Sequence, residues 1–225
     1  MDYSQPSKPR VLLAASGSVA AIKFENLCRS FSEWADVRAV ATASSLHFID
    51  GSSLPSDIVL YTDDDEWSTW KKIAYEVLHI ELRKWADIMV IAPLLANTMA
   101  KVPFSLYYFV HIAGGLCDNL LTCIVRAWDY SKPLFVAPAM NTLMWNNPFT
   151  KRHLQTVNQL GIILIPPVDV LFYASVLSLP VMMSRILRVG GKLVVTEVAS
   201  SRPSNDSDNE SIEFVIVSKY SYAAV

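Results

Sequence analysis

Pro133-Leu134-Phe135-Val136-Ala137 is a short apolar run, and Pro138-Ala139-Met140-Asn141-Thr142-Leu143-Met144-Trp145 directly follows it. An uninterrupted apolar run of this length is typical of a strand buried on both faces of a parallel sheet. Open α/β sheets bind their ligands in the crevice beyond the carboxyl ends of such strands. A single amide, Asn141, stands there between the thioethers Met140 and Met144, which is unusual for a solvated loop. The stretch after the run is therefore predicted to be a functional site.

Strand-like and helix-like segments alternate along most of the chain. This alternation predicts an α/β fold with a doubly wound parallel sheet, a flavodoxin-like Rossmann fold. Strands are expected at residues 10–15, 37–42, 57–61, 87–92, 133–137 and 162–165. Helices are expected from Val19 towards Trp34, after a cap at Ser44-Ser45, and at residues 76–85, 114–128 and 150–160. Residues 63–66 are expected to form an acidic loop, and Trp67 and Trp70 behind it to pack in and around the core.

Composition excludes several classes of protein. The chain has 225 residues, 52% of them hydrophobic and 18% charged, with a net charge of −2. No basic excess indicates binding to nucleic acid. Three cysteines, Cys28, Cys117 and Cys123, make no metal or disulfide framework, so we expect free thiols in a reducing compartment and no metal. Residues 1–9 are expected to form a flexible polar arm without a secretory signal, so the cytoplasm is the expected location.

Two segments depart from the alternation. Residues 102–111 form an aromatic stretch. The chain also becomes irregular after Pro167, so residues 10–167 are expected to form the domain and 168–225 an atypical tail, partly disordered. The apolar run Val168–Val189 is long enough to span a bilayer, but charges and a proline interrupt it. A segment that packs in the core, or that fits no regular element, is therefore favoured over a membrane helix. Residues 192–198 and 212–217 have strand-like composition.

Three polar loops are expected at neighbouring carboxyl ends of strands. They are Ser16-Gly17-Ser18, Thr42-Ala43-Ser44-Ser45 and Leu95-Ala96-Asn97-Thr98. Backbone amides and hydroxyls at such turns, with a helix N-terminus behind them, suit a mononucleotide phosphate. Each loop could equally be a helix cap alone. The three-glycine turn and the acidic ribose ligand of nicotinamide enzymes are absent, which argues against that class.

His79 begins the helical stretch Val77-Leu78-His79-Ile80-Glu81-Leu82. A histidine among apolar neighbours is more often a packing residue, but an imidazole is also the side chain best suited to act as a base near neutral pH. The sequence pattern leaves both roles open. Asp118-Asn119 is expected to cap the following helix rather than to bind a ligand.

Four motifs occur in one order: residues 15–21, 78–82, 92–98 and 138–145. Together they resemble the flavin-dependent cysteine decarboxylase family, most closely its plant phosphopantothenoylcysteine decarboxylase (halotolerance protein) branch. The resemblance covers residues 10–167. It implies bound FMN, a homotrimer with active sites at subunit interfaces, and decarboxylation of 4'-phospho-N-pantothenoylcysteine towards 4'-phosphopantetheine in coenzyme A biosynthesis.

The resemblance also implies roles for particular residues. His79 would be the base that starts oxidation of the substrate thiol, Asn141 would hold the substrate carboxylate, and Met144 would shape the same pocket. FMN would be bound by residues of the polar loops and of the site after the apolar run: Gly17, Ser18, Val19, Thr42, Ser44, Ser45, Phe48, Leu95, Ala96, Asn97, Thr98 and Ala139.

The chain departs from the family pattern in three places. Leu95 stands where the family usually has serine, and residues 102–111 are an insertion between Lys101 and Ile112. No cysteine follows Cys123, so the acid that a family member carries on its C-terminal flap is absent. Oxidation and decarboxylation would remain, and the reaction would stall at the enethiol. The alternative is a non-catalytic flavoprotein-fold subunit, regulatory or trimer-forming, as in the phosphatase-inhibitory halotolerance proteins of fungi.

Overall fold

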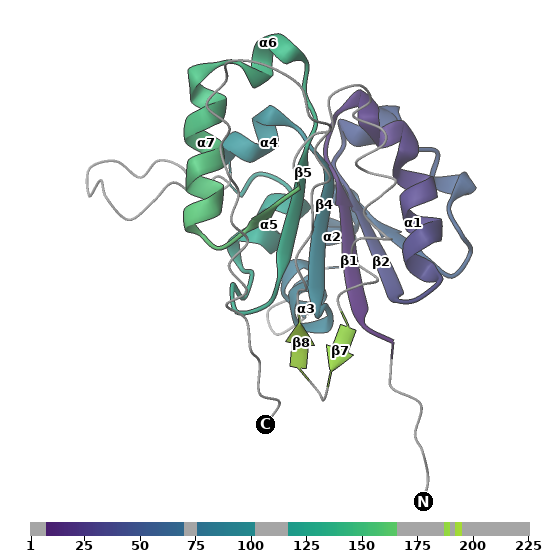
Figure 1. Cartoon of the computed structure of the whole chain (residues 1–225). Coiled ribbons are helices and arrows are strands. Elements are labelled where there is room, and N and C mark those ends of the chain that lie inside the picture. The colour runs from purple at the N-terminus through teal and green to yellow at the C-terminus, as the bar shows by residue number, and fades with distance from the viewer. Residues whose placement is uncertain (1–7, 70–75, 102–116, 166–186, 190–191, 195–225) are drawn as a thin grey trace, which may run out of the picture. The chain divides into compact units, whose positions relative to one another are not determined.

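The computed structural model describes residues 8–69, 76–101, 117–165, 187–189 and 192–194. The chain divides into two compact units, residues 1–177 and 178–225. Unit 1 holds the sheet and the helices around it (Figure 1). In unit 2 the strands β7 (Leu187–Val189) and β8 (Lys192–Val194) pair antiparallel. The expectations for residues 102–111, and those for the tail apart from β7 and β8, lie outside the described residues.

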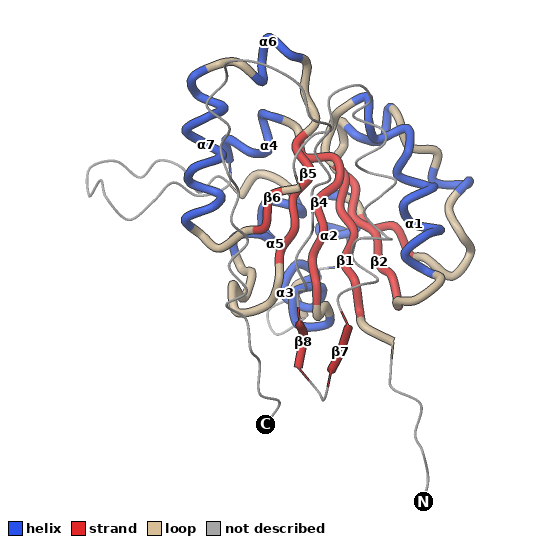
Figure 2. Tube along the Cα trace, viewed as in Figure 1, coloured by secondary structure: helices blue, strands red, loops and turns tan. Residues whose placement is uncertain are grey.

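Unit 1 is built on one six-stranded sheet. Its strands are β1 (Arg10–Ala15), β2 (Asp36–Ala41), β3 (Val59–Tyr61), β4 (Ile88–Leu94), β5 (Leu134–Pro138) and β6 (Ile163–Leu164). They lie in the order β3-β2-β1-β4-β5-β6, and every pair is parallel. Figure 2 shows β2, β1, β4, β5 and β6 side by side in red. The predicted α/β class and parallel sheet are confirmed. The strand order is that of the Rossmann fold and differs from the flavodoxin order 2-1-3-4-5.

Burial explains why the central strands are apolar without interruption. Every residue of β4 and of β5 is buried, and in β1 only Arg10 is not. Side chains alternate between the two faces of the sheet. On one face Leu12 and Met89 join a core cluster that includes Leu82 and Leu121 of the covering helices. On the other face α1 packs against β1 and β2.

The helices run between the strands in sequence. Two short 3₁₀ turns, η2 (Ser45–His47) and η3 (Gly51–Ser53), precede β3. The remaining helices are η1 (Val19–Lys23), α1 (Phe24–Ser32), α2 (Asp63–Thr69), α3 (Leu78–Trp85), α4 (Ala96–Lys101), α5 (Leu120–Arg126), α6 (Thr142–Trp145) and α7 (Pro148–Gln159). Among the described residues no helix is both long and apolar enough to cross a membrane.

Three local expectations were wrong. The helix expected after Ser44-Ser45 is only the turn η2, and the Ser44 side chain makes no cap bond. The acidic residues 63–66 form the first turn of α2 rather than a loop, since negative charge is favourable at a helix N-terminus. Trp67, on that helix, is 78% exposed and does not pack in the core. Trp70 lies outside the described residues.

Asn119 caps α5, as the sequence indicated. Its side chain accepts a hydrogen bond from the Thr122 N–H, and the Thr122 hydroxyl accepts one from the Asn119 N–H, which makes a capping box. Within the described residues the helix begins at Leu120, later than the expected start at residue 114.

Replacing this cap should destabilise unit 1 measurably. We expect Asn119→Ala to lower the free energy of unfolding by about 1 kcal/mol, because the buried start of α5 loses its acceptor. Urea unfolding followed by circular dichroism measures this as a lower midpoint at unchanged slope. Asn158→Ala, at an exposed position within α7, is the matched control and should leave the midpoint in place. Equal midpoints for the two variants would contradict the role of the cap.

Candidate active site

The first and third predicted loops meet between β1 and β4, where the strand order reverses direction. Ser16, fully buried after β1, joins them. Its hydroxyl donates to the Pro93 carbonyl at 3.0 Å and accepts from the Leu95 N–H at 2.7 Å. In open α/β sheets this reversal point is where ligands bind. Ser16 belongs to the first predicted loop but was not named as an FMN-binding residue; its two hydrogen bonds hold the first and third loops together.

The first and second loops touch at Gly17. A Cβ built on Gly17 would lie 2.3 Å from Ser44 Oγ and 2.5 Å from Ser44 Cβ. No side chain fits there without moving the second loop, so the glycine is required by close approach rather than by its torsion angles. Ser18 caps η1, and its side chain accepts from the Ala20 N–H at 3.4 Å. Val19, the next residue, is 54% exposed beside the loop.

The second loop uses most of its hydroxyls internally. Thr42 and Ser45 are buried, and the Ser45 hydroxyl lies 2.7 Å from the Thr42 carbonyl and 3.1 Å from the Ala15 carbonyl. The exposed hydroxyl residue is Ser44, whose Oγ lies 3.2 Å from Thr42 Oγ1. Phe48 ends η2 and is half-buried. Of the three predicted hydroxyl donors, Ser44 is therefore the one placed to reach a ligand.

The third loop begins α4, a helix that the sequence analysis did not predict. The Leu95 N–H is already bonded to Ser16, and Thr98 is buried. Asn97 is exposed and Ala96 is half-buried. Ala139, after β5, is also buried, and its N–H donates to the Leu94 carbonyl at 2.9 Å. The end of β5 is thus fastened to the end of β4.

Asn141 lies beyond β5 and caps the short helix α6. Its Oδ1 accepts from the Met144 N–H at 2.9 Å, while the side chain remains exposed. No hydrogen bond to another described residue uses its two amide N–H donors. Met144 is 40% exposed on the same helix. The cap therefore fixes the amide and leaves its donors available to an anionic group.

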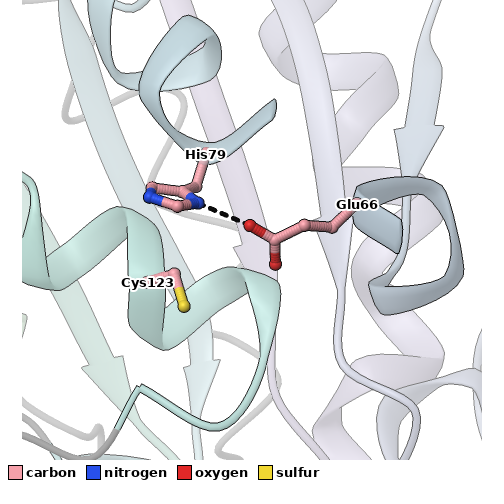
Figure 3. Close-up of side chains that lie close together, drawn as sticks. All are labelled: Glu66, His79 and Cys123. Carbon is pink, nitrogen blue, oxygen red and sulfur yellow. Dashed lines mark hydrogen bonds and ion pairs between the residues drawn. The ribbon is translucent and has the colours of Figure 1, made fainter. Parts of the chain in front are cut away.

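His79 lies in the first turn of α3, and its Nδ1 is 2.5 Å from Glu66 Oε1 of α2 (Figure 3). The Cys123 thiol of α5 lies beside both, and the three candidate ligand atoms are within 4.8 Å of one another. Burial, and then the Glu66 carboxylate, raises the pKa of Cys123 to about 12, so it remains a thiol at neutral pH. Glu66 was not predicted from the sequence as a site residue.

The structure brings some predicted site residues together and separates others. The three loops and Ala139 meet at the carboxyl ends of the strands through the contacts above. Asn141 and Met144 follow at the same end of the sheet. Helix α3 lies instead beside the half of the sheet where β4 begins (Figure 1). Within one copy of the chain, His79 and Asn141 are on elements near different ends of the sheet.

The fold and this edge of the sheet define a class of protein. The model of the flavoprotein family matches residues 2–179, and the chain belongs to that family. A rice (Oryza sativa subsp. japonica) protein named phosphopantothenoylcysteine decarboxylase is 80% identical over 168 residues, which are 75% of this chain and 72% of the relative.

Two solved structures agree with this relationship. The FMN-binding protein AtHal3 is 70% identical, with a TM-score of 0.66 over 72% of this chain and 82% of that one. A PPC decarboxylase mutant, with one cysteine replaced by serine and complexed with pantothenoylaminoethenethiol, is also 70% identical; its TM-score is 0.66 over 72% of this chain and 84% of that one. The resemblance predicted from the four motifs is confirmed.

Proposed function

We propose that the chain is an FMN-dependent decarboxylase of 4'-phospho-N-pantothenoylcysteine in coenzyme A biosynthesis. The observation that carries the proposal is the meeting of the polar loops at the reversal point of a Rossmann-type sheet, in a chain 80% identical to a phosphopantothenoylcysteine decarboxylase. We expect it to act in the cytosol.

The residues present fit the flavin. Gly17 leaves its backbone open where a Cβ would collide with Ser44, as a loop that cradles a phosphate requires. Around it we place the remaining FMN-binding residues. Ser18, Val19, Ser44 and Asn97 offer donors or surface to the ligand, whereas Thr42, Ser45, Thr98 and Ala139 shape the loops from inside. The rest of the proposed FMN site is lined by Phe48, Leu95 and Ala96.

The substrate groups follow from the chemistry. His79 accepts the proton of the substrate thiol as its carbon is oxidised to a thioaldehyde. The oxidation removes a hydrogen and an electron pair from that carbon. Bound FMN would supply the capacity to accept them and to return them later. Asn141 donates its amide hydrogens to the substrate carboxylate, and Met144 lines the pocket. When the carboxylate leaves as carbon dioxide, the electron pair of the broken bond passes into the carbon–sulfur unit and gives an enethiol.

A second copy of the chain completes the site in this account. The helix α3, which carries His79, and the helix α6, which Asn141 caps, lie near different ends of one sheet, and a second copy would bring the two side chains together. A homotrimer with active sites at its interfaces, as the family resemblance implies, would place the His79 of one subunit at the Asn141 of another. Light scattering tests this: we expect three times the mass of the chain, and a monomer would contradict it.

The return of the electrons to the enethiol needs an acid. In the family a flap cysteine supplies that proton, and here no cysteine follows Cys123. The mutant relative described above has one cysteine replaced by serine and holds an aminoethenethiol. That complex supports the proposal that this chain decarboxylates its substrate and then retains the enethiol, with the flavin left reduced.

Restoring the family's serine at position 95 should strengthen FMN binding. The Leu95 side chain offers no donor, and its N–H is already bonded to Ser16. A neutral hydrogen bond contributes about 1 kcal/mol, so we expect Leu95→Ser to lower the Kd for FMN about fivefold. Quenching of FMN fluorescence measures this. Leu95→Ala, which removes the same side chain without adding a hydroxyl, is the control, and an equal gain in both variants would contradict the expectation.

A further inference from the structure

Three helices place Glu66, His79 and Cys123 against one another (Figure 3). The contact to the imidazole is the 2.5 Å approach of Glu66 Oε1 to Nδ1. Both side chains are largely shielded, with 24% of His79 and 13% of Glu66 exposed. A hydrogen-bonded contact between two groups so shielded from water differs from a pair of solvated surface charges, which contributes little.

The ionised carboxylate restricts the imidazole to one form. A carboxylate only accepts hydrogen bonds, so Nδ1 must carry the hydrogen in this contact. In the neutral ring the other nitrogen, Nε2, then has the lone pair. The Cys123 thiol stays protonated beside them, so it adds no second negative charge to the group. The local geometry therefore sets which atom of His79 can accept a proton.

Helix α2 is itself fixed in place. The Asp63 carboxylate accepts from the Leu120 N–H at 2.7 Å, which ties the start of α2 to the start of α5. The Asp65 carboxylate accepts from the Thr62 N–H at 2.7 Å. Glu66 is on the same helix and packs towards α3. These bonds hold the Glu66 carboxylate at the imidazole before any ligand arrives.

We infer that Glu66 is the positioning residue for His79: its carboxylate holds Nδ1–H, leaves Nε2 as the basic atom, and stabilises the imidazolium that forms when the substrate thiol gives up its proton. This rests on the proposed function, since it concerns the base of that reaction. Glu66 touches neither substrate nor flavin in this account and acts through His79 alone. The arrangement follows the logic of carboxylate–histidine pairs in other enzymes.

Two substitutions at Glu66 separate orientation from charge. In Glu66→Gln the amide oxygen still accepts from Nδ1–H but the negative charge is lost. In Glu66→Ala both are lost. We expect the rate of substrate-driven flavin bleaching to fall roughly 10-fold in the first variant and on the order of 100-fold in the second. Each loss is part of the rate enhancement that a positioned general base provides. Glu66 does not contact the substrate, so the affinity for the substrate should stay unchanged.

Asp64 offers matched controls on the same helix. It is exposed, and Asp64→Asn and Asp64→Ala remove the same charge without touching the imidazole. Both should bleach at the wild-type rate. Equal losses in the Asp64 and Glu66 variants would mean that the net charge or the stability of α2 matters rather than the contact, and would overturn the inference.

A second readout examines the contact without any reaction. Nitrogen-15 NMR of histidine-labelled protein distinguishes the two neutral ring forms, and the His79 signals are identified by their loss in His79→Asn. We expect the Nδ1–H form in wild type and in Glu66→Gln, and a shift towards the Nε2–H form in Glu66→Ala. The same form in all three proteins would overturn the inference.

Two further outcomes are decisive. Stoichiometric zinc in the purified wild type, lost in Glu66→Ala, would overturn the inference, because Nδ1 would then be a metal ligand in the cluster of Glu66, His79 and Cys123. A wild type whose flavin the substrate never bleaches would refute the proposed function, and with it the role of Glu66 in positioning a base for that reaction. The NMR result would still show whether the Glu66 contact exists, so the two failures are distinguishable.

Discussion

A Gly17→Ala variant should fold and purify largely without its yellow colour. The added Cβ would lie 2.3 Å from Ser44 Oγ and 2.5 Å from Ser44 Cβ, so the second loop must move away from the first. Overpacking of this kind costs about 1 to 3 kcal/mol. In the proposed site the two loops form the FMN cradle together, so we expect this cost to weaken FMN binding and the Kd for FMN to rise on the order of 100-fold. Titration of the flavin-free protein with FMN measures it.

Gly51 provides the matched control for this substitution. A Cβ at Gly51 would meet Leu60 Cδ2 at 3.6 Å, an ordinary contact, so Gly51→Ala makes the same chemical change without a collision. That variant should retain its flavin. If Gly17→Ala bound FMN as tightly as Gly51→Ala does, the first two loops would not be the flavin cradle.

An Asn141→Asp variant should keep its structure and lose its reaction with the substrate. Aspartate caps helices as well as asparagine does, so α6 retains its bond from the Met144 N–H. The two amide donors are lost, and a negative charge now faces the substrate carboxylate. A hydrogen bond to a charged group is worth about 1.5 to 3 kcal/mol. We expect the rate constant for flavin bleaching at low substrate concentration to fall on the order of 100-fold, with FMN affinity unchanged.

The neighbouring cap, Asn147, tests whether the loss is specific. Its side chain accepts from the Phe149 N–H at the start of α7, the same kind of bond as at Asn141. Asn147→Asp makes an identical change one helix later and should bleach at the wild-type rate. Equal losses in the two variants would mean that added negative charge alone slows the reaction, and that Asn141 does not hold the substrate carboxylate.

The strands were predictable because burial leaves a simple pattern. β1 has the expected bounds, Arg10–Ala15, since a strand covered on both faces requires an unbroken apolar run. Helix α2 was missed because four successive acidic residues also suit a solvated loop. Their charge favours a helix N-terminus, and two tertiary contacts then fix the helix: Asp63 binds the start of α5 and Glu66 binds His79. The spacing of Asp63 and Glu66, three residues apart, was the one local sign that both side chains share a helix face.

The candidate site was predictable in its place but not in the use of each residue. Loops that follow parallel neighbouring strands must meet, so their polar residues could be grouped from the sequence. Whether a hydroxyl points inward is decided by carbonyls that the sequence does not locate. Ser45 bonds within the fold, whereas Ser44, one residue earlier, is exposed. Ser16 joins loops 77 residues apart, a role set by the adjacency of β1 and β4.

The most direct test is the absorbance spectrum of the FMN-loaded chain, recorded without air, before and after addition of phosphopantothenoylcysteine. His79 and Asn141 should support oxidation and loss of carbon dioxide, and no cysteine after Cys123 returns the proton. We therefore expect the flavin bands to bleach, one carbon dioxide to be released per flavin, and the bands to stay bleached while the enethiol remains bound. Bands that never bleach, or that recover with release of phosphopantetheine, would contradict this account.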